Sequence, residues 1–337
     1  MKRYSIYDVA KKAGVGIGTV SRVINNSKHV KDSTRERVLK VIEELDYKPD
    51  FFARNLVKKT SKTIGLLIPD IINPVFPEMA KGVSDKAFLN GYTVFLGNTD
   101  ESIEKEVKLV NQLIEKRVDG IIFISTEMCN KEGDYTHYTY LMEKNIPIVL
   151  INGFIKGTDI PFVRIDEQKS GYLATKHMIK KGLRKIAFLG GPENSIPTND
   201  KLKGYKKAFK EFNLTIENKY IILDKHEIQN GFKNTINLLN MKERPEGIIT
   251  VSDALAIEAI RAARAKNISI PDNLKIIGFD DIKFSASFSP SITTVAQPKY
   301  KMGTMALGML IHLIEKKELP ERKVVIEPKL LLRESCP

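Results

Sequence analysis

Cysteine is nearly absent from this chain of 337 residues. Its two cysteines, Cys129 and Cys336, lie far apart in the sequence, so they form neither the closely spaced pairs of a zinc site nor a disulfide framework. Disulfide-dependent chains belong to oxidising compartments, so this composition favours the reducing cytosol. We therefore expect a cytoplasmic protein without a structural metal.

Long apolar segments are lacking as well. No stretch approaches the roughly 20 consecutive apolar residues that span a bilayer. The charges at the N-terminus are not followed by the apolar run of a signal peptide. These absences predict a soluble chain that is not exported. Its length exceeds what one hydrophobic core normally serves, so two or three domains are expected.

The usual signatures of catalysis are missing too. The sequence contains no GxSxG, no HExxH, no P-loop GxxxxGK[ST] and no GxGxxG after a strand. Five histidines are present without the spacing of metal ligands: His29, His137, His177, His226 and His312. We therefore expect no enzyme activity, no cofactor and no metal.

The first positive signal lies in residues 4–26. Ser5 and Asp8 match a capping box, so a helix should begin near Ile6. Gly14 supplies a turn, and a second short helix follows it. The inward positions of the two helices recur at intervals of three and four: Ile6, Val9, Ala10, Ala13, Val20, Val23 and Ile24. This arrangement is typical of the helix-turn-helix, whose second helix enters the DNA major groove.

A third amphipathic helix is predicted next, with Ser33 and Glu36 as its capping box. Its inward stripe is Val38, Val41, Ile42 and Leu45. Positive charge gathers in the same region. Residues 1–62 hold fifteen Lys and Arg against seven Asp and Glu, so +8 of the net charge of +13 lies there. A basic region of this kind is the electrostatic footprint of a phosphate-binding surface, so the head is predicted to bind DNA.

From Thr63 onward the pattern becomes that of an α/β protein. Short apolar runs without alternation, typical of buried parallel strands, occur in two series: TIGLLIP, YTVFLGN, DGIIFIS and IPIVLIN, then KIAFLGG, YIILD, GIITVSD and KIIGFDD. Helical segments are predicted between them, near residues 76–89, 103–116 and 138–144. Two successive series imply two doubly wound α/β lobes.

Polar residues follow these strands, where doubly wound sheets bind their ligands. They are Asp70, Asn73, Asn98, Asp100, Asn152, Ser252, Asp253, Asp280 and Asp281. Turn residues gather at strand ends in any case, but here they converge from both lobes. The sequence therefore predicts a cleft lined with hydrogen-bonding groups, suited to a sugar, a nucleoside or another polar small molecule.

The segments IYDVAKKAGVGIGTVSRVINN, VKDSTRERVLKVIEELDYKPD and ARNL resemble the DNA-binding head of the LacI/GalR family of bacterial transcriptional regulators. Later segments, from DIINPVF to IPDNLKIIGFDD and SITTVAQP, resemble family landmarks in family order. The resemblance implies an all-α helix-turn-helix head and a two-lobed, periplasmic-binding-protein-like α/β core of two doubly wound parallel sheets. The implied divisions are 1–48 for the head, 49–62 for the hinge helix and linker, 63–337 for the core, 63–162 with 294–317 for the N-lobe, and 163–293 with 324–333 for the C-lobe.

The resemblance also implies which residues contact DNA. In the family, paired hinge helices enter the minor groove and a leucine wedges between base pairs, a position that Leu56 occupies here, with Ala53 one turn earlier. Arg22 can bind guanine O6 and N7 with both guanidinium nitrogens, and Ile17 can touch a thymine methyl. The Ile17-Gly18 pair departs from common family choices, which leaves the operator half-site open. The carried-over set is Tyr7, Ile17, Gly18, Thr19, Ser21, Arg22, Asn25, His29, Ala53 and Leu56.

The effector positions implied by the family are Phe76, Asn152, Lys201, His226, Ser252, Asp280 and Gln297. Asp280 would accept hydrogen bonds from ligand hydroxyls, Gln297 would bridge the lobes, and His226 stands where an aromatic lid is common. Lys201 replaces the usual arginine, and a lysine is a point charge without a planar fork, so the identity of the effector stays open.

The implied function is a homodimeric repressor of carbohydrate uptake or catabolism genes that binds a palindromic operator under the control of a small molecule, a sugar or sugar derivative. One alternative is a catabolite-control-type regulator whose co-regulator is a phosphorylated carrier protein. Lys201 and Tyr300 match that branch, whereas Lys301 and Gly308 do not. An alternative of another class is a sugar-binding module or enzyme in which the head is incidental.

Overall fold

A computed structural model of the protein describes residues 4–24, 27, 29–47, 60–124, 135–225 and 228–337. The chain divides into two compact units, Met1–Lys62 and Thr63–Pro337, here called the head and the core. Each is described by itself. Within the described ranges, no helix combines the length and the apolar character that crossing a membrane requires.

The described part of the head contains three helices, α1 (Ile6–Ala13), α2 (Ile17–Ile24) and α3 (Asp32–Glu44). The predicted capping box at the start of α1 is confirmed. The Ser5 backbone N–H donates to Asp8 Oδ2 over 2.7 Å, and the Asp8 N–H donates to Ser5 Oγ over 3.4 Å. Gly14 ends α1 with φ at 64°, the left-handed conformation that glycine adopts without steric cost. The turn therefore forms for the reason that the sequence predicts.

The predicted start of α3 is wrong. Its N-cap is Lys31, which has no side-chain capping bond, so Ser33 lies inside the helix. The Lys31 carbonyl accepts the N–H groups of Thr34 and Arg35. Asp32 then stands in the first turn, where its carboxylate interacts favourably with the helix dipole. The dipole interaction of Asp32 takes the place of the expected capping box.

The first sheet of the core has six parallel strands in the order β11-β5-β4-β3-β1-β2. Their bounds are β1 Thr63–Ile68, β2 Thr93–Asn98, β3 Gly120–Ile124, β4 Ile148–Ile151, β5 Phe162–Ile165 and β11 Lys323–Ile326. Four helices cover it: α5 Val75–Leu89, α6 Ile103–Glu115, α7 Thr136–Glu143 and α13 Lys299–Ile314. Helices α5 and α13 pack on one face, while α6 and α7 pack on the other. The three helices predicted in this region are present, with ends within two residues of those expected.

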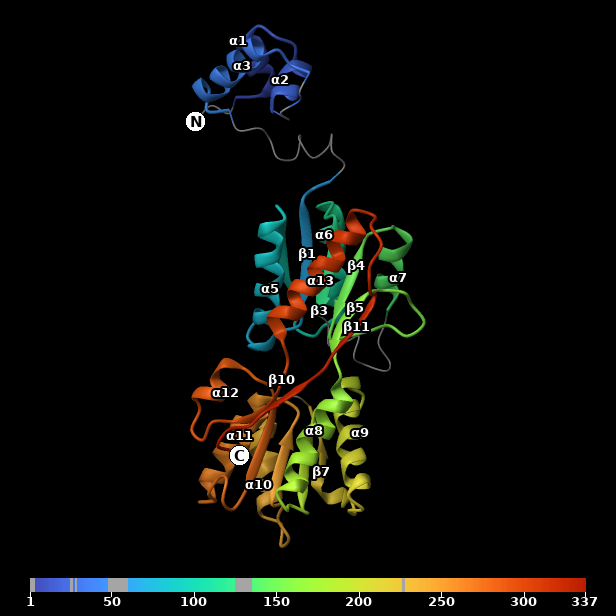
Figure 1. Cartoon of the computed structure of the whole chain (residues 1–337), viewed down its shortest axis with the longest axis vertical. Helices are drawn as coiled ribbons and strands as arrows, with labels where there is room; N and C mark the ends of the chain where they lie inside the picture. Colours follow the sequence, from blue (N-terminus) through green and yellow to red (C-terminus); the bar gives the residue numbers. More distant parts are fainter. Residues whose placement is uncertain (1–3, 25–26, 28, 48–59, 125–134, 226–227) are drawn as a thin grey trace. The chain divides into compact units, whose positions relative to one another are not determined.

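The second sheet has the order β12-β10-β9-β8-β6-β7, in which only β12 is antiparallel. Its strands are β6 Ile186–Gly190, β7 Ile221–Leu223, β8 Gly247–Thr250, β9 Lys275–Asp280, β10 Thr293–Ala296 and β12 Lys329–Leu331. Its helices are α8 Glu167–Lys180, α9 Ile196–Glu211, η2 Asn218–Tyr220, α10 Ile228–Leu239, α11 Asp253–Ala265 and α12 Lys283–Ser287. Helices α8 and α9 pack on one face and α11 on the other. Figure 1 shows the two sheets of the core and the chain segments that run between them.

The chain crosses between the two sheets at places that differ from the predicted boundaries. Strand β5 belongs to the first sheet as far as Ile165, and β10 belongs to the second, so the predictions for 163–165 and 294–296 are wrong. Strand β11 was assigned to the C-lobe but pairs with β5, with Val324 opposite Val163. Short apolar strands look alike in sequence, so their pattern does not reveal which sheet they join.

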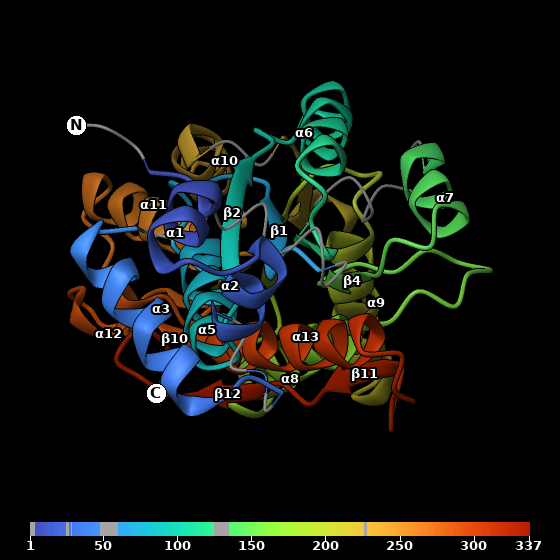
Figure 2. The same cartoon turned by 90° about the horizontal axis from the view of Figure 1, so that it is seen from above.

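Each lobe holds one very close helix crossing made by a pair of glycines. A Cβ at Gly303 of α13 would lie 2.1 Å from the Met79 carbonyl oxygen of α5, and one at Gly82 of α5 would lie 2.2 Å from the Tyr300 oxygen. Helices α5 and α13 lie side by side in both views (Figures 1 and 2). In the other lobe, Gly171 of α8 and Gly204 of α9 form the corresponding pair. The absence of side chains at these positions allows the backbones to touch.

Candidate nucleic-acid interface and effector cleft

The exposed side of α2 is the candidate DNA-reading face. Val20 and Val23 are fully buried in the core of the head, which fixes the rotation of the helix. The opposite side therefore presents Ile17, Gly18 and Arg22 to solvent. Nothing lies within 4 Å of a Cβ placed at Gly18, so the backbone there is open to a partner. The Arg22 guanidinium makes no ion pair with any of the described residues, and its planar group of donors suits a base edge.

The other predicted DNA-binding residues fall into two groups. Tyr7, with 68% of its surface exposed, and His29 are also on the surface, whereas Thr19 and Ser21 are half-buried residues of α2 itself. Asn25, Ala53 and Leu56 lie outside the described residues. The exposed predicted contacts in the described part of the head come from α1, α2 and the segment after them.

In the core, a chain of amide and carboxylate groups joins the two lobes. Asn152 follows β4 with φ at 63°, a left-handed conformation that asparagine tolerates well. Its Nδ2 lies 3.5 Å from Gln297 Oε1, and Gln297 Nε2 donates to Asp280 Oδ1 over 2.6 Å. Asp280 ends β9 with φ at 103°, a strained conformation of the kind that gathers at functional sites. The structure therefore places Gln297 between the lobes, where the sequence predicted a bridge.

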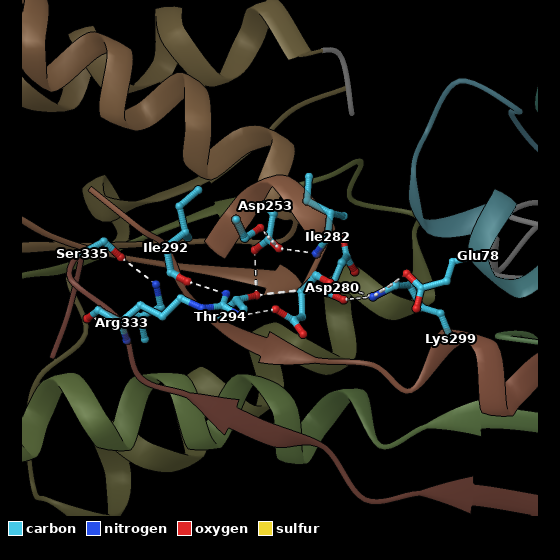
Figure 3. A network of polar contacts seen from close by, with 12 residues as sticks. Glu78, Asp253, Asp280, Ile282, Ile292, Thr294, Lys299, Arg333 and Ser335 are labelled. Carbon is cyan, nitrogen blue, oxygen red and sulfur yellow. Dashed lines mark hydrogen bonds and ion pairs between the residues drawn. The ribbon is translucent and has the colours of Figure 1, made fainter. Parts of the chain in front are cut away.

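Lys299 closes the same junction from the start of α13. It is almost fully buried, and its Nζ donates to the Asp280 carbonyl oxygen over 2.5 Å and to that of Asp281 over 2.9 Å. Its ammonium also lies 3.6 Å from Glu78 Oε2 of α5 (Figure 3). Burial raises the pKa of the Asp280 carboxyl, against the positive charges of Lys201 and Lys299 and the Gln297 hydrogen bond.

Lys201 is held by a single carboxylate. Its Nζ lies 2.8 Å from Glu167 Oε2, and the Lys201 side chain is only 6% exposed. The ammonium also stands 5.2 Å from the centre of the Phe279 ring. Burial raises the pKa of Glu167, and Lys201 opposes that rise. Lys201, at the position where the resemblance implies an arginine, therefore has a carboxylate partner within the protein itself.

Asp253 lies behind Asp280 and is completely buried. Its Oδ2 accepts the Ile282 N–H over 3.0 Å and the Ser285 hydroxyl over 2.5 Å, and its Oδ1 accepts the Thr294 hydroxyl over 2.7 Å. Burial, together with the nearby Asp280 charge, raises the pKa of Asp253 to about 7. These hydrogen bonds connect α11 to the segment after β9 and to β10, so they hold the backbone next to Asp280 in place (Figure 3).

Two of the predicted effector residues, Phe76 and Ser252, make other contacts. Phe76 is buried in the apolar core of the first lobe. Ser252 caps α11, with its hydroxyl accepting the Leu255 N–H over 3.4 Å. His226 lies outside the described residues. The set that the structure brings together is smaller: Asn152, Gln297 and Asp280, with Lys201 nearby.

A pocket open to solvent extends from Asn152 toward α8 and α9. Its lining residues are Asn152, Gly153, Phe154, Arg164, Ile165, Glu167, Ile196, Pro197 and Asp200. Sequence reasoning identified Asn152 and missed the others. The available signal was an arginine inside the short apolar strand FVRI, where a charge is unexpected.

Comparisons with known proteins agree with this architecture. Residues 5–50 match the family model "Bacterial regulatory proteins, lacI family", and residues 175–336 match "Periplasmic binding protein-like domain". The ribose operon repressor of Halalkalibacterium halodurans is 40% identical over 331 residues, which cover 98% of this chain and 96% of that protein. The chain belongs to the LacI family.

Two further relatives support this membership. Catabolite control protein A of Priestia megaterium is 35% identical over 98% of both chains. A periplasmic binding protein/LacI transcriptional regulator from Alkaliphilus metalliredigens, solved in complex with D-xylulofuranose, is 31% identical, with a TM-score of 0.70 over 82% of this chain and 99% of that one. The predicted family, the fold class and the function as an effector-controlled, DNA-binding transcriptional regulator are confirmed for this LacI-family chain.

Proposed function

We propose that this LacI-family protein is a cytoplasmic, homodimeric repressor of carbohydrate uptake or catabolism genes. It binds a palindromic operator through α1 and α2 of two heads, and it has no enzymatic activity. The observation that carries the proposal is the exposed Arg22 on α2 of a basic head, joined to a core whose lobes meet at Asn152, Gln297 and Asp280. The relative solved with D-xylulofuranose supports a sugar as the effector.

Control of DNA binding follows from the junction between the lobes. A ligand hydroxyl that bonds to Asp280 or Asn152 competes with the Gln297 bridge, so occupation of the cleft changes how the lobes are held together. Such a ligand shifts the core between arrangements only to the extent that it binds them differently. The coupling free energy between effector and operator is expected to be about 1–3 kcal/mol, in the range usual for allosteric proteins.

The DNA-reading face is tested with Arg22→Ala. We expect its affinity for a specific operator, selected from random duplexes by the unmodified chain, to fall about 10- to 100-fold, because a forked arginine contact with guanine contributes roughly 1–3 kcal/mol of discrimination. Fluorescence anisotropy over a salt series gives the affinity and its salt dependence. The matched control is Arg37→Ala, since Arg37 is an exposed arginine of α3 away from α2. Equal losses in the two variants would mean that only net charge matters.

The proposed dimer is supported by apolar side chains left on the surface of the first lobe. Phe88 and Leu89, at the end of α5, are 82% and 79% exposed, and Phe95 and Leu96 of the neighbouring edge strand β2 are also exposed. Large apolar side chains that stay exposed at a helix end and on an edge strand favour association with another copy of the chain. Sedimentation of the full chain at micromolar concentration is expected to give a dimer, and a monomer at all concentrations would contradict the proposal.

The second candidate is control by a phosphorylated carrier protein bound on the first lobe. The 35% identity to catabolite control protein A and the exposed Tyr300, which donates to Asp85 over 3.1 Å, favour it. Lys301 and Gly308 on the same helix oppose it, because they lack the acidic group and the arginine expected there. Calorimetry with the phosphorylated and unmodified carrier protein decides the question, since this candidate requires binding of the phosphorylated form alone.

A further inference from the structure

Arg164 occupies an unusual place at the carboxyl end of β5. Its neighbours Val163 and Ile165 are buried, while Arg164 points to the opposite side of the sheet and lines the pocket that begins at Asn152. The guanidinium lies over two rings, 4.7 Å from the centre of Phe154 and 5.9 Å from that of Phe162. Stacking of this kind holds the planar group in one orientation and leaves its edges free to bind an oxyanion.

The acidic side chains of the pocket do not neutralise Arg164. Glu167 is paired with Lys201 over 2.8 Å, and Asp200 is paired with Lys203 over 2.7 Å. No carboxylate of the described residues lies within ion-pair distance of Arg164, and its buried Nε has no hydrogen-bond partner among them. Among the described residues, each carboxylate that lines the pocket thus pairs with a lysine, and the Arg164 guanidinium has no carboxylate partner.

The start of helix α9, which also lines the pocket, favours a negatively charged ligand as well. Ile196 and Pro197, the first residues of α9, line the pocket, and the first turn of this 16-residue helix carries no acidic residue. The N-terminus of a helix carries a partial positive charge and stabilises anions. Arg164 and the start of α9 therefore place positive potential on two sides of one pocket.

We propose that the effector carries an anionic group, a carboxylate or a phosphate, and that Arg164 binds it while Asn152 and Asp280 bind its hydroxyls. The effector class is then a sugar acid or a sugar phosphate rather than a neutral sugar. This inference rests on the proposed function, because it assigns a ligand to the same cleft.

The test compares each neutral sugar with its two anionic counterparts on the full-length chain. The panel is D-ribose, D-ribonate and D-ribose 5-phosphate, then D-glucose, D-gluconate and D-glucose 6-phosphate. Thermal shift ranks the compounds, and titration calorimetry gives the affinity of the best. At least one anionic compound is expected to bind 10-fold or more tightly than its neutral parent, because charge-assisted hydrogen bonds are the strong ones. The carboxylate and phosphate arms identify which anion is selected.

Three variants assign the effect to Arg164. Arg164→Gln should lower the affinity for the anionic ligand about 10- to 100-fold and change the affinity for neutral sugars by less than about threefold. Arg164→Lys keeps the positive charge but lacks the planar pair of donors, so its affinity for the anionic ligand should lie between those of the unmodified chain and Arg164→Gln. The matched control is Arg322→Gln, since Arg322 lies on the surface beside β11, 3.5 Å from Asp159. Operator binding by each variant verifies that it is folded.

The outcomes separate the two proposals. If no anionic compound binds more tightly than its neutral parent, or if Arg164→Gln binds the anion as well as the unmodified chain does, the inference is wrong. Neutral sugars that bind and alter operator affinity would then leave the proposed function intact. If the unmodified chain binds no operator, with or without any of the sugars, the proposed function itself is wrong.

Discussion

Gly303→Ala is expected to lower the free energy of unfolding of the core by about 3 kcal/mol or more. The new Cβ would lie 2.1 Å from the Met79 carbonyl oxygen and 3.0 Å from the Val83 nitrogen, both of which are backbone atoms of α5. A side chain can rotate away from an added methyl group, but a helix backbone must be displaced as a whole. Overpacking typically costs about 1–3 kcal/mol, and a backbone clash of this size belongs at or beyond the upper end.

The same helix supplies the matched control. Gly308 lies five residues further along α13, and nothing stands within 4 Å of its Cβ position. Gly308→Ala should therefore stabilise the core by about 0.5–1 kcal/mol, since alanine is the better helix former. Urea unfolding followed by far-UV circular dichroism measures both variants. If the two substitutions shift the transition in the same direction, the close contact of α5 and α13 does not exist as described.

Gly303 also shows what the sequence can and cannot reveal. A glycine in a helical segment is visible from sequence, but its role depends on a crossing with a helix more than two hundred positions earlier in the chain. The capping box of Ser5 and the apolar run of β1 are local, so they were predictable. The membership of β11 in the first sheet was not, because pairing with β5 is decided by packing at long range.

The candidate site divides in the same way. Asp280 and Gln297 were predicted as effector contacts because they follow recognisable strands and family landmarks, and the structure joins them by a 2.6 Å hydrogen bond. Arg164 was not predicted as a pocket residue, because an arginine in a short strand suggests an exposed edge position. Only the order of strands in the sheet shows that Arg164 and Asn152 line the same pocket. Phe76 matched a family position but packs into the core. Sequence patterns locate strand ends, whereas the direction of a side chain there depends on the sheet.

The second large effect is a loss of stability as the pH rises from about 4 to 7, caused by Asp253. In the unfolded chain this carboxyl ionises near 3.8, whereas in the folded protein burial and the Asp280 charge raise its pKa to about 7. Between these values the folded protein keeps a proton that the unfolded chain has lost. The free energy of unfolding therefore falls with increasing pH across this window and is constant with respect to this group above it. At 1.36 kcal/mol per pKa unit, the full contribution is about 4 kcal/mol.

Asp253→Asn removes the titrating carboxyl. It should therefore remove the contribution of Asp253 to the pH dependence of the free energy of unfolding. The amide can accept the Ile282 N–H and the Ser285 hydroxyl through its oxygen and donate to Thr294 through its nitrogen, because a threonine hydroxyl can also accept. The difference in stability between variant and unmodified chain, measured by urea unfolding at intervals from pH 4 to pH 8, should move in favour of the variant as the pH rises and level off near pH 7. Asp272→Asn, at an exposed aspartate of the same lobe, is the control and should show no such trend. A stability difference for Asp253→Asn that stays constant over the whole range would mean that the buried carboxyl is ionised throughout, with its three donors outweighing the cost of burial.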